Sequence, residues 1–344
     1  MSHSFFAFWE QLGENPALAL FTLLTLGVLL VNGWTDAPNA IAGAVVTGAL
    51  SFRRAVLLAA VCNVLGVCCV TAVNASVAET VYSIASFSGG PRAASVALSA
   101  GMAGVVLWAA ACWRWGIPTS ESHALVAGIT GAAVALEGDL SCVRWESWEK
   151  VLLGLFLSTA AGFWAGRMAG RAARRWRGTD RLFRRLQLPG AAATAFFHGA
   201  QDGQKFLGVF LLGVALVQGR QDEQTFVVPL WLMLFCAIGM ALGTGLGGRR
   251  IIDRVGREMV TLSPRDGFAC DVAGVGCLLA ATVLGLPVST THTRTAALLG
   301  VGSAGGKQAD WGVAGTIALA WVFTFPGCAA LGWGMARLFL HLGQ

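Results

Sequence analysis

Two carboxylates stand at the centre of two similar polar segments. The first segment reads Asn-Gly-Trp-Thr-Asp-Ala-Pro-Asn-Ala around Asp36, and the second reads His-Gly-Ala-Gln-Asp-Gly-Gln-Lys-Phe around Asp202. Apolar runs flank both segments. A carboxylate in apolar surroundings costs a few kcal/mol, so a chain retains one there for a function or for a partner. The chemistry that suits such an acid is the binding of a small cation or a proton.

We therefore predict that each acid helps to bind a coupling ion, Na⁺ or H⁺. Amide and hydroxyl groups beside each acid supply neutral ligands. The predicted ligands of the coupling ion are Asp36, Asn32, Thr35, Asp202, Gln201 and Gln204. The structural alternative for a single acid of this kind is a helix N-cap or a loop at the membrane interface.

A second pair of segments carries hydroxyl groups directly after a proline. Gly-Ile-Pro-Thr-Ser-Glu-Ser-His ends at His123, and Gly-Leu-Pro-Val-Ser-Thr-Thr-His ends at His292. Proline fits the first turn of a helix, where free N–H groups and the helix dipole attract anions. One hydroxyl would suffice for simple capping, and each segment has three. The predicted ligands of a tetrahedral oxyanion are Thr119, Ser120, Ser122, Ser289, Thr290, Thr291, Asn39 and Lys205.

Other ionisable residues of these segments need partners. Lys205 requires a carboxylate such as Asp202, unless it extends to the membrane interface. Glu121 stands where the other copy has Thr290, and an acid beside an anion site repels the anion unless it is protonated or paired. We predict a proton-coupling role for Glu121. His123 and His292 are expected to be hydrogen-bonded packing residues, so no metal beyond Na⁺ and no organic cofactor are predicted.

Membrane helices must position these residues. The chain of 344 residues is 56% hydrophobic and only 12% charged, whereas soluble domains are about 25% charged. Its apolar blocks have the length of about 20 residues that crosses a bilayer core, which predicts an all-α integral membrane protein with about 10–12 membrane segments. The predicted segments are residues 16–50 (interrupted), 54–74, 94–113, 116–136, 149–168, 190–217, 225–247, 267–285, 287–302 and 312–340.

The paired segments also indicate an internal repeat. Asp36 precedes Pro118 by 82 positions, and Asp202 precedes Pro287 by 85. Residues 1–170 and 190–344 are therefore predicted to be two halves. Five crossings in each half would invert the second copy, which is the architecture of secondary transporters with broken or re-entrant helices at the midplane. The Gly and Pro residues predict such breaks at residues 33–38, 116–118, 199–203 and 285–287.

The net charge of +6 lies mainly in three basic clusters. By the predicted crossings the clusters fall on one side, and short basic loops mark the cytoplasmic side. We expect both termini outside, a multi-pass protein in the cell membrane, attraction to lipid headgroups, and no nucleic-acid partner. The clusters are Arg53–Arg54, a basic linker over residues 171–189 with neighbouring arginines from Arg167 onward, and the group Arg249, Arg250, Arg254 and Arg257.

At these residues the chain resembles the inorganic phosphate transporter family, which comprises bacterial low-affinity phosphate permeases and their sodium-coupled eukaryotic relatives. Residues 32–51 resemble its Gly-x-x-Asp-x-x-Asn-Ala signature, and residues 198–208 resemble its His-Gly-x-x-Asp-Gly-Gln-Lys-x-x-Gly signature. Residues 118–123 and 287–292 resemble its paired Pro-x-Ser-x-x-His motifs, and residues 247–267 and 311–327 are also similar to family segments.

The resemblance implies import of inorganic phosphate by alternating access, coupled to a Na⁺ or H⁺ gradient. It places the ion at the Asp motifs and phosphate at the hydroxyl motifs, and it implies a homodimer in the cell inner membrane. Thr35 and Gln201 stand where many members have asparagine. The reach of these two side chains differs from that of asparagine, so both coupling ions remain open.

Three other functions compete with phosphate import. A related permease for sulfate or another oxyanion would use the same hydroxyl clusters. An intramembrane hydrolase would need a single Ser–His–Asp set in contact, whereas these motifs occur twice, so an enzyme is not predicted. A passive channel would need no coupling acids.

Overall fold

The computed structural model describes residues 5–115, 117, 119–221, 228–253, 262–304 and 311–342. Of the residues singled out above, Gly116, Pro118, Arg254 and Arg257 lie outside the described part. Within these ranges the chain forms helices and no β-strand, apart from one bridge between Ala85 and Val143.

The helices follow one another along the whole described chain. They are α1 (Phe5–Glu14), α2 (Pro16–Thr35), α3 (Pro38–Val46), α4 (Phe52–Val73), α5 (Ser76–Tyr82), α6 (Pro91–Arg114), α7 (Glu121–Glu137), α8 (Trp145–Arg175), α9 (Asp180–His198), a π-helical turn (Gly199–Gly203), α10 (Gln204–Val217), α11 (Leu230–Gly247), α12 (Arg249–Asp253), α13 (Pro264–Val283), α14 (Thr290–Ala304) and α15 (Trp311–Leu342).

Six helical segments among the described residues are long and apolar enough to cross a membrane. These segments are Pro16–Val46, Phe52–Val73, Pro91–Arg114, Trp145–Arg175, Pro264–Val283 and Ala314–Leu342. An all-α membrane protein is therefore confirmed. The other predicted segments are helices too, but α7 and α14 have only 17 and 15 residues, fewer than the roughly 20 that a full crossing needs.

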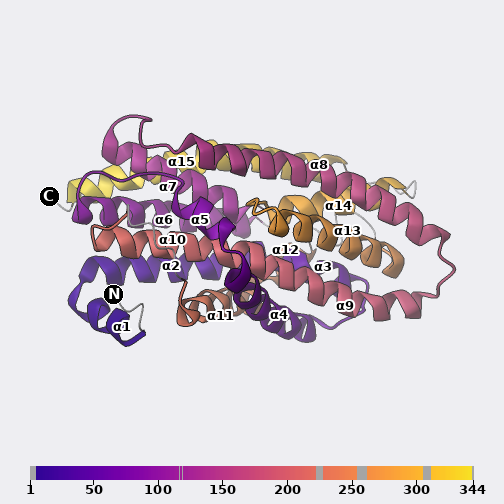
Figure 1. The fold of residues 1–344 in the computed structure, drawn as a ribbon. Coiled ribbons are helices and arrows are strands. Elements are labelled where there is room, and N and C mark those ends of the chain that lie inside the picture. Colours follow the sequence, from indigo (N-terminus) through magenta and orange to yellow (C-terminus); the bar gives the residue numbers. More distant parts are fainter. Residues whose placement is uncertain are drawn as a thin grey trace.

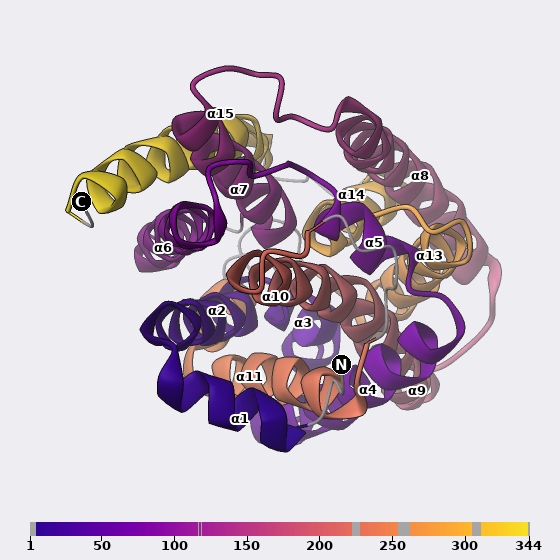
Figure 2. The ribbon, with the colours of Figure 1, turned by 60° about the vertical axis from the view of Figure 1, so that its left-hand side comes forward.

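The helices run mainly along the long axis of the molecule, and both termini lie at the same end (Figure 1). The turn between α8 and α9 lies at the opposite end (Figure 1). A view turned by 60° places α3 and α10 near the middle, with the other helices around them (Figure 2). The middle of the molecule is therefore enclosed by protein on all sides.

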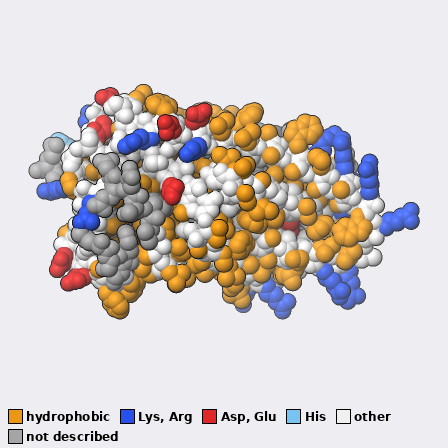
Figure 3. Space-filling model, in the orientation of Figure 1, with side chains coloured by type: hydrophobic (Ala, Val, Ile, Leu, Met, Phe, Trp, Pro, Cys, Tyr) orange, Lys and Arg blue, Asp and Glu red, His pale blue; other side chains and the backbone are white. Residues whose placement is uncertain are grey.

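Lysine and arginine side chains gather at the end where α8 meets α9, and we call it the basic end (Figure 3). Arg184 lines a hollow there together with Gly48–Leu50 of the turn before α4. The guanidinium of Arg249 lies 5.7 Å from the ring centroid of Phe52, next to Arg53. The predicted linker at 171–189 is largely helical, because α8 extends to Arg175 and α9 begins at Asp180.

Two short helices each pack against a long helix that is distant in the sequence, α7 against α15 and α14 against α8. On α7, a Cβ added to Gly131 would lie 2.1 Å from the carbonyl oxygen of Ala329 in α15. On α14, a Cβ added to Gly300 would lie 2.0 Å from the carbonyl oxygen of Phe163 in α8. Small residues at such contacts let membrane helices approach closely. The two contacts are similar, because in each a glycine of the short helix lies against a backbone carbonyl oxygen of the long helix.

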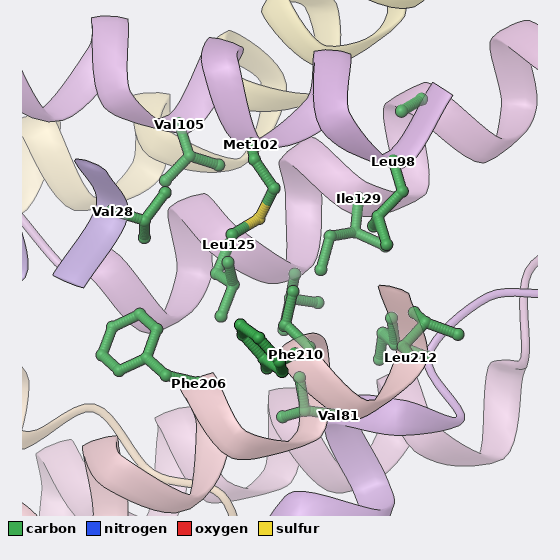
Figure 4. Close-up of a cluster of buried hydrophobic side chains, with 14 of the residues drawn as sticks. Val28, Val81, Leu98, Met102, Val105, Leu125, Ile129, Phe206, Phe210 and Leu212 are labelled. Atoms are coloured by element: carbon green, nitrogen blue, oxygen red, sulfur yellow. The ribbon is translucent and has the colours of Figure 1, made fainter. Parts of the chain in front are cut away.

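The largest hydrophobic cluster lies on the side of the termini, where α2, α5, α6, α7 and α10 pack together (Figure 4). Phe206 and Phe210 of α10 point toward Leu125 of α7 and Met102 of α6 (Figure 4). Lipid tails are as apolar as these side chains, so the contacts stabilise the bundle chiefly through close van der Waals packing. The cluster gives the central polar residues a rigid apolar surround.

Candidate functional site

Asp36 lies in a break between two helices. The preceding helix α2 ends at Thr35, and α3 begins at Pro38. Proline has no N–H to continue the ladder, so the helix breaks there. The backbone N–H of Asp36 still donates to the carbonyl oxygen of Asn32 at 2.8 Å. The break predicted at residues 33–38 is present, and it presents the Asp36 side chain to the middle of the molecule, where it is fully buried.

Asp202 lies in a π-helical turn, so the break predicted at residues 199–203 is wrong. Backbone hydrogen bonds continue through Gly199–Gly203 from α9 into α10. The second segment has Gln204 where the first has Pro38. Its backbone N–H groups are all available, and the chain widens into a single π turn instead of breaking. Such turns are frequent at functional sites.

A helix begins within each of the two hydroxyl segments, α7 in the first and α14 in the second. The Ser120 hydroxyl accepts from the backbone N–H of His123 at 3.4 Å and caps α7. The Ser289 hydroxyl accepts from the backbone N–H of His292 at 3.2 Å at the start of α14. Capping therefore accounts for one hydroxyl of each segment. Of the remaining hydroxyls, those of Ser122, Thr290 and Thr291 are buried and lie in the central cluster with the two acids.

Asp36 receives its hydrogen bonds from the start of α14. The Thr291 hydroxyl donates to its Oδ1, and the Thr290 hydroxyl lies 3.2 Å from the same oxygen. The Asn39 amide donates to the Thr291 hydroxyl at 2.9 Å. The predicted cation segment and the predicted anion segment therefore form one cluster, although they stand about 250 positions apart in the chain.

Asp202 is held by charged and polar partners. The Lys205 ammonium donates to its Oδ1 at 2.7 Å, to the Ser122 hydroxyl at 2.7 Å and to the Val288 carbonyl oxygen at 2.5 Å. The Thr290 hydroxyl lies 3.2 Å from Asp202 Oδ2. Lys205 has the carboxylate partner that the sequence required, and it ties α10 to α7 and to the segment before α14.

Glu121 is the third buried acid of the cluster. The Thr35 hydroxyl donates to its Oε1 at 3.0 Å. No described residue lies within hydrogen-bond distance of its Oε2. Glu121 therefore contacts the Asp36 segment through the neutral Thr35 hydroxyl, and no Lys, Arg or His of the described chain forms an ion pair with it.

The acids of the cluster outnumber its basic residues. Asp36, Glu121 and Asp202 are all 0% exposed, and Lys205 is 2% exposed. If all three acids are ionised, the cluster carries a formal charge of −2 with neutral histidines. Buried charges persist only when they are paired, coordinated or neutralised. A cation or a proton is the species that would complete this balance.

Several buried oxygens are available to a cation. Among the described residues, none donates a hydrogen bond to Asp36 Oδ2 or to the side-chain oxygens of Asn32 and Asn39. Asn32 nevertheless lies close to Asp202. Oxygen atoms are the ligands of hard cations. The donor set fits Na⁺ or a proton, and the described chain has no group of three His, Cys, Asp or Glu side chains placed to hold a metal ion.

Three predicted site residues are engaged elsewhere. The Gln201 amide contacts Thr282, Leu286 and Val288, and the Gln204 amide contacts Asn74 and Ala78. The side-chain oxygens of Gln201 and Gln204 each accept a hydrogen bond from a backbone N–H group. The Thr119 hydroxyl pairs with the Thr324 hydroxyl of α15 at 2.9 Å. These residues hold the surrounding segments, while the other predicted residues meet in the centre.

The two motif histidines are packing residues, as expected, but the hydrogen bonds expected for the His292 ring are absent from the described structure. The His123 and His292 rings lie 4.7 Å apart between centroids, and His292 stacks on Trp321 at 3.7 Å. Neither ring nitrogen of His292 has a hydrogen-bond partner in the described structure. The aromatic neighbours of the two rings lie on α15, far from the motifs in the sequence, so the motif sequences alone could not reveal them.

One residue of the cluster was missed from the sequence. His198 Nδ1 lies 3.3 Å from Asp202 Oδ2 and 3.3 Å from the Thr290 hydroxyl. Its place four positions before Asp202 puts it on the same helical face, and that spacing could have revealed it. A hydrolytic triad needs one ring nitrogen on the acid and the other on the hydroxyl. Here one nitrogen serves both, so the arrangement does not suit hydrolysis.

Comparison with known proteins gives consistent matches. A family described as the Phosphate transporter family matches residues 32–180 and 167–332. A probable low-affinity inorganic phosphate transporter of Bacillus subtilis is 33% identical over 320 residues, which cover 91% of this chain and 94% of that protein. A protein of the same description from Mycobacterium tuberculosis strain H37Rv is 36% identical over 326 residues, covering 90% of this chain and 75% of that one.

A solved structure titled "The sodium-dependent phosphate transporter" has the same fold. Its TM-score is 0.82 at 21% sequence identity, and the match covers 94% of this chain and 99% of the other. The resemblance seen in the motifs is thus confirmed over most of the sequence, and the prediction of a transporter rather than an enzyme is confirmed with it. This chain belongs to the phosphate transporter family.

Proposed function

We propose that this protein carries inorganic phosphate into the cell by secondary active transport, coupled to a gradient of Na⁺ or H⁺. The observation that carries the proposal is the single buried cluster in which two helix N-termini, one lysine and three carboxylates meet. Helix N-termini and an ammonium group attract an anion. The carboxylates attract the cation that must accompany it.

Phosphate would bind between the starts of α7 and α14. The groups that would donate to it are Ser122, Thr290, Thr291, Asn39 and Lys205. Thr119, Ser120 and Ser289 would hold the two helix starts in place. At neutral pH phosphate retains a proton that it can donate to a carboxylate, whereas sulfate has none. The nearby acids therefore favour phosphate over the alternative cargo.

The charge balance supports coupling. Phosphate is an anion, and a cluster of formal charge −2 would repel it in a medium that screens charge poorly. Binding becomes favourable when a cation or a proton enters with the phosphate. Asp36, Asn32 and Asn39 offer unpaired oxygens to Na⁺, and Glu121 is the candidate proton carrier. Na⁺ is the first ion to test, since the similar solved structure is titled as sodium-dependent.

Alternating access is the mechanism that we propose for movement across the membrane. The two halves, residues 1–170 and 190–344, would be inverted copies that rock around the central cluster. With the basic end in the cytoplasm, both termini would lie outside (Figure 1). We also propose a homodimer in the cell membrane on the basis of the family resemblance, and light scattering of the purified protein would report its mass.

The test is uptake of labelled phosphate into liposomes that contain the purified protein. A Na⁺ gradient and a pH gradient are imposed separately, and sulfate is added as competitor in a parallel series. We expect phosphate to accumulate above its equilibrium level under at least one gradient. Phosphate flux that does not depend on either gradient would favour a channel. Complete inhibition of phosphate uptake by sulfate at the same concentration would favour a permease for sulfate or another oxyanion.

A further inference from the structure

A buried ion pair lies one helical turn beyond the central cluster. On α14, Arg294 follows Thr290 by four positions and so lies on the same face of the helix. Its Nη2 donates to Asp271 Oδ1 of α13 at 2.8 Å, and its Nη1 donates to the Cys270 carbonyl oxygen at 3.0 Å. Arg294 is 5% exposed and Asp271 is 1% exposed. The central cluster makes no use of this pair.

The pair retains unused hydrogen-bonding capacity. Arg294 Nε and Asp271 Oδ2 have no partner among the described residues. Two glycines make room for the pair, because a Cβ on Gly190 would lie 2.9 Å from Asp271 Oδ2 and one on Gly274 would lie 2.7 Å from Arg294 Cδ. A guanidinium presents several donors in a planar fork, which suits carboxylate and phosphate alike.

Polar side chains connect the pair with the basic end. Arg294 Nη1 lies 3.4 Å from the Thr194 hydroxyl of α9. Nearer the start of α9, the Gln187 amide accepts from the hydroxyl of Thr47, the residue after α3, at 2.5 Å and donates to the Pro264 carbonyl oxygen at 2.5 Å. The Thr194 and Gln187 side chains are 0% exposed. Buried polar groups therefore follow α9 from the central cluster toward the basic end.

This line of polar groups ends at an open basic hollow. The hollow has a volume of about 490 Å³ and lies between α9 and the turn after α3. Three arginines line it, together with one acid: Arg181, Arg184, Arg185 and Asp180. A basic concave surface raises the local concentration of anions. An anion that passes between the cluster and this hollow would meet Arg294 on the way.

The first half has apolar residues at the equivalent places. Helices α6 and α13 end 169 positions apart, at Arg114 and Val283, and α7 and α14 begin 169 positions apart. The same offset matches Asp271 with Met102 and Arg294 with Leu125. Those two belong to the large hydrophobic cluster (Figure 4). The ion pair therefore occurs only on the side of the cluster that faces the basic end.

We propose that Arg294 is a second anion-binding residue, which holds phosphate in transit between the central cluster and the basic end. Asp271 occupies the guanidinium while no phosphate is there, since a buried charge without a partner is costly. When the basic side opens, the phosphate exchanges with the carboxylate and leaves toward the hollow. This inference rests on the proposed transport of phosphate.

The test uses a variant that copies the first half. Asp271→Met/Arg294→Leu installs the pair that already packs as Met102 and Leu125, so it removes both charges together. Arg174→Met is the matched control, because it breaks a partly exposed ion pair with Asp266 at the same end of the molecule, at 3.3 Å. Each protein is measured for equilibrium binding of labelled phosphate, for uptake into liposomes and for melting temperature.

We expect the double variant to keep its melting temperature and its phosphate affinity within about twofold, while uptake falls at least about tenfold, the effect of losing one strong charged contact. Arg174→Met is expected to bind and transport as the unaltered protein does. In Asp271→Asn the guanidinium loses its competitor, so phosphate on the basic side should inhibit at about tenfold lower concentration.

Three results would overturn the inference. Uptake by the double variant equal to that of the unaltered protein would show that Arg294 handles no anion. Joint loss of binding, uptake and melting temperature would show that the pair is structural. Absence of phosphate uptake by the unaltered protein under every gradient would overturn the proposed function, and the inference with it.

Discussion

Asp36 and Asp202 occupy matching places in two similar segments, and the protein surrounds them differently. Asp36 lies in a helix break made by Pro38, and neutral hydroxyl groups donate hydrogen bonds to its side chain. Asp202 lies in a continuous π turn, and Lys205 holds it at 2.7 Å. The comparison teaches that two similar segments can place an acid at the same position and surround it with different charge partners.

We propose that this difference divides the work between the two acids. Asp202 has Lys205 as its charge partner, and we assign it to the framework of the anion site. Asp36 has an oxygen to which no described residue donates a hydrogen bond, and we assign it to the binding of the cation. The first two experiments below test the two sides of this proposal.

The largest effect on stability is expected from Asp202→Asn. The substitution leaves Lys205 buried without an anionic partner, which typically costs about 3–5 kcal/mol. The measurement is the melting temperature and the unfolding free energy of the purified protein. Asp202→Asn/Lys205→Met removes both charges and should recover most of the loss. Equal destabilisation of the single and double variants would mean that the ion pair does not hold this region.

Asp36→Asn should act on coupling instead of stability. No lysine or arginine of the described chain forms an ion pair with Asp36, so we expect a change in unfolding free energy within about 1 kcal/mol. Gradient-driven phosphate uptake should fall at least about tenfold, the equivalent of 1.4 kcal/mol of cation binding. Unchanged accumulation in this variant would remove Asp36 from the coupling site.

Glu121→Gln sharpens the assignment of the ion. The amide oxygen of glutamine can still accept from Thr35, so a stability change of only about 1 kcal/mol is expected. Uptake driven by a pH gradient should be lost if Glu121 carries the proton, while uptake driven by Na⁺ should stay near that of the unaltered protein. Liposome uptake under the two separate gradients measures this. Equal loss under both gradients would place Glu121 in the phosphate site.

The smallest effect is expected at Asp139, an acid outside the membrane helices. The side-chain hydroxyl and then the backbone N–H of Ser141 donate to it, and they hold the pKa of its carboxyl below the usual 3.8. A depressed pKa in the folded protein contributes stability above pH 3.8 that is lost as the pH falls through the folded value.

Asp139 is fully exposed, so solvent screens this contribution. Asp139→Asn should therefore leave phosphate uptake unchanged. It should lower the melting temperature slightly at pH 6, and the difference should vanish near pH 2. A variant that lost uptake would show that acids in the loop before α8 take part in transport.

Much of the central site could be predicted because it rests on short segments with strong local rules. Proline before hydroxyl groups predicts a capped helix start, and the described residues after both prolines form one. A charged residue within apolar runs predicts a functional or paired group, as Lys205 and Asp202 are. The helix break at Pro38 followed from the missing N–H of proline.

The other contacts of the site could not be predicted, because they form between segments that are distant in the sequence and no local sequence pattern indicates them. Thr324 meets Thr119 from the middle of an apolar helix, and Gln201 and Gln204 turn toward backbone groups of other helices. The Arg294–Asp271 pair required both members to be placed across two helices. Glycines alone could not distinguish the π turn at Gly199–Gly203 from a break, because they permit either conformation.

The crossed packing of α7 on α15 and of α14 on α8 has a consequence for biosynthesis. During translation, α7 leaves the ribosome long before α15, so its face around Gly131 has no native neighbour until nearly the whole chain has been made. We therefore expect α7 to reach its final packing only after α15 has been inserted. Truncation before α15 should therefore expose α7 to the quality-control proteases that remove incompletely assembled membrane proteins.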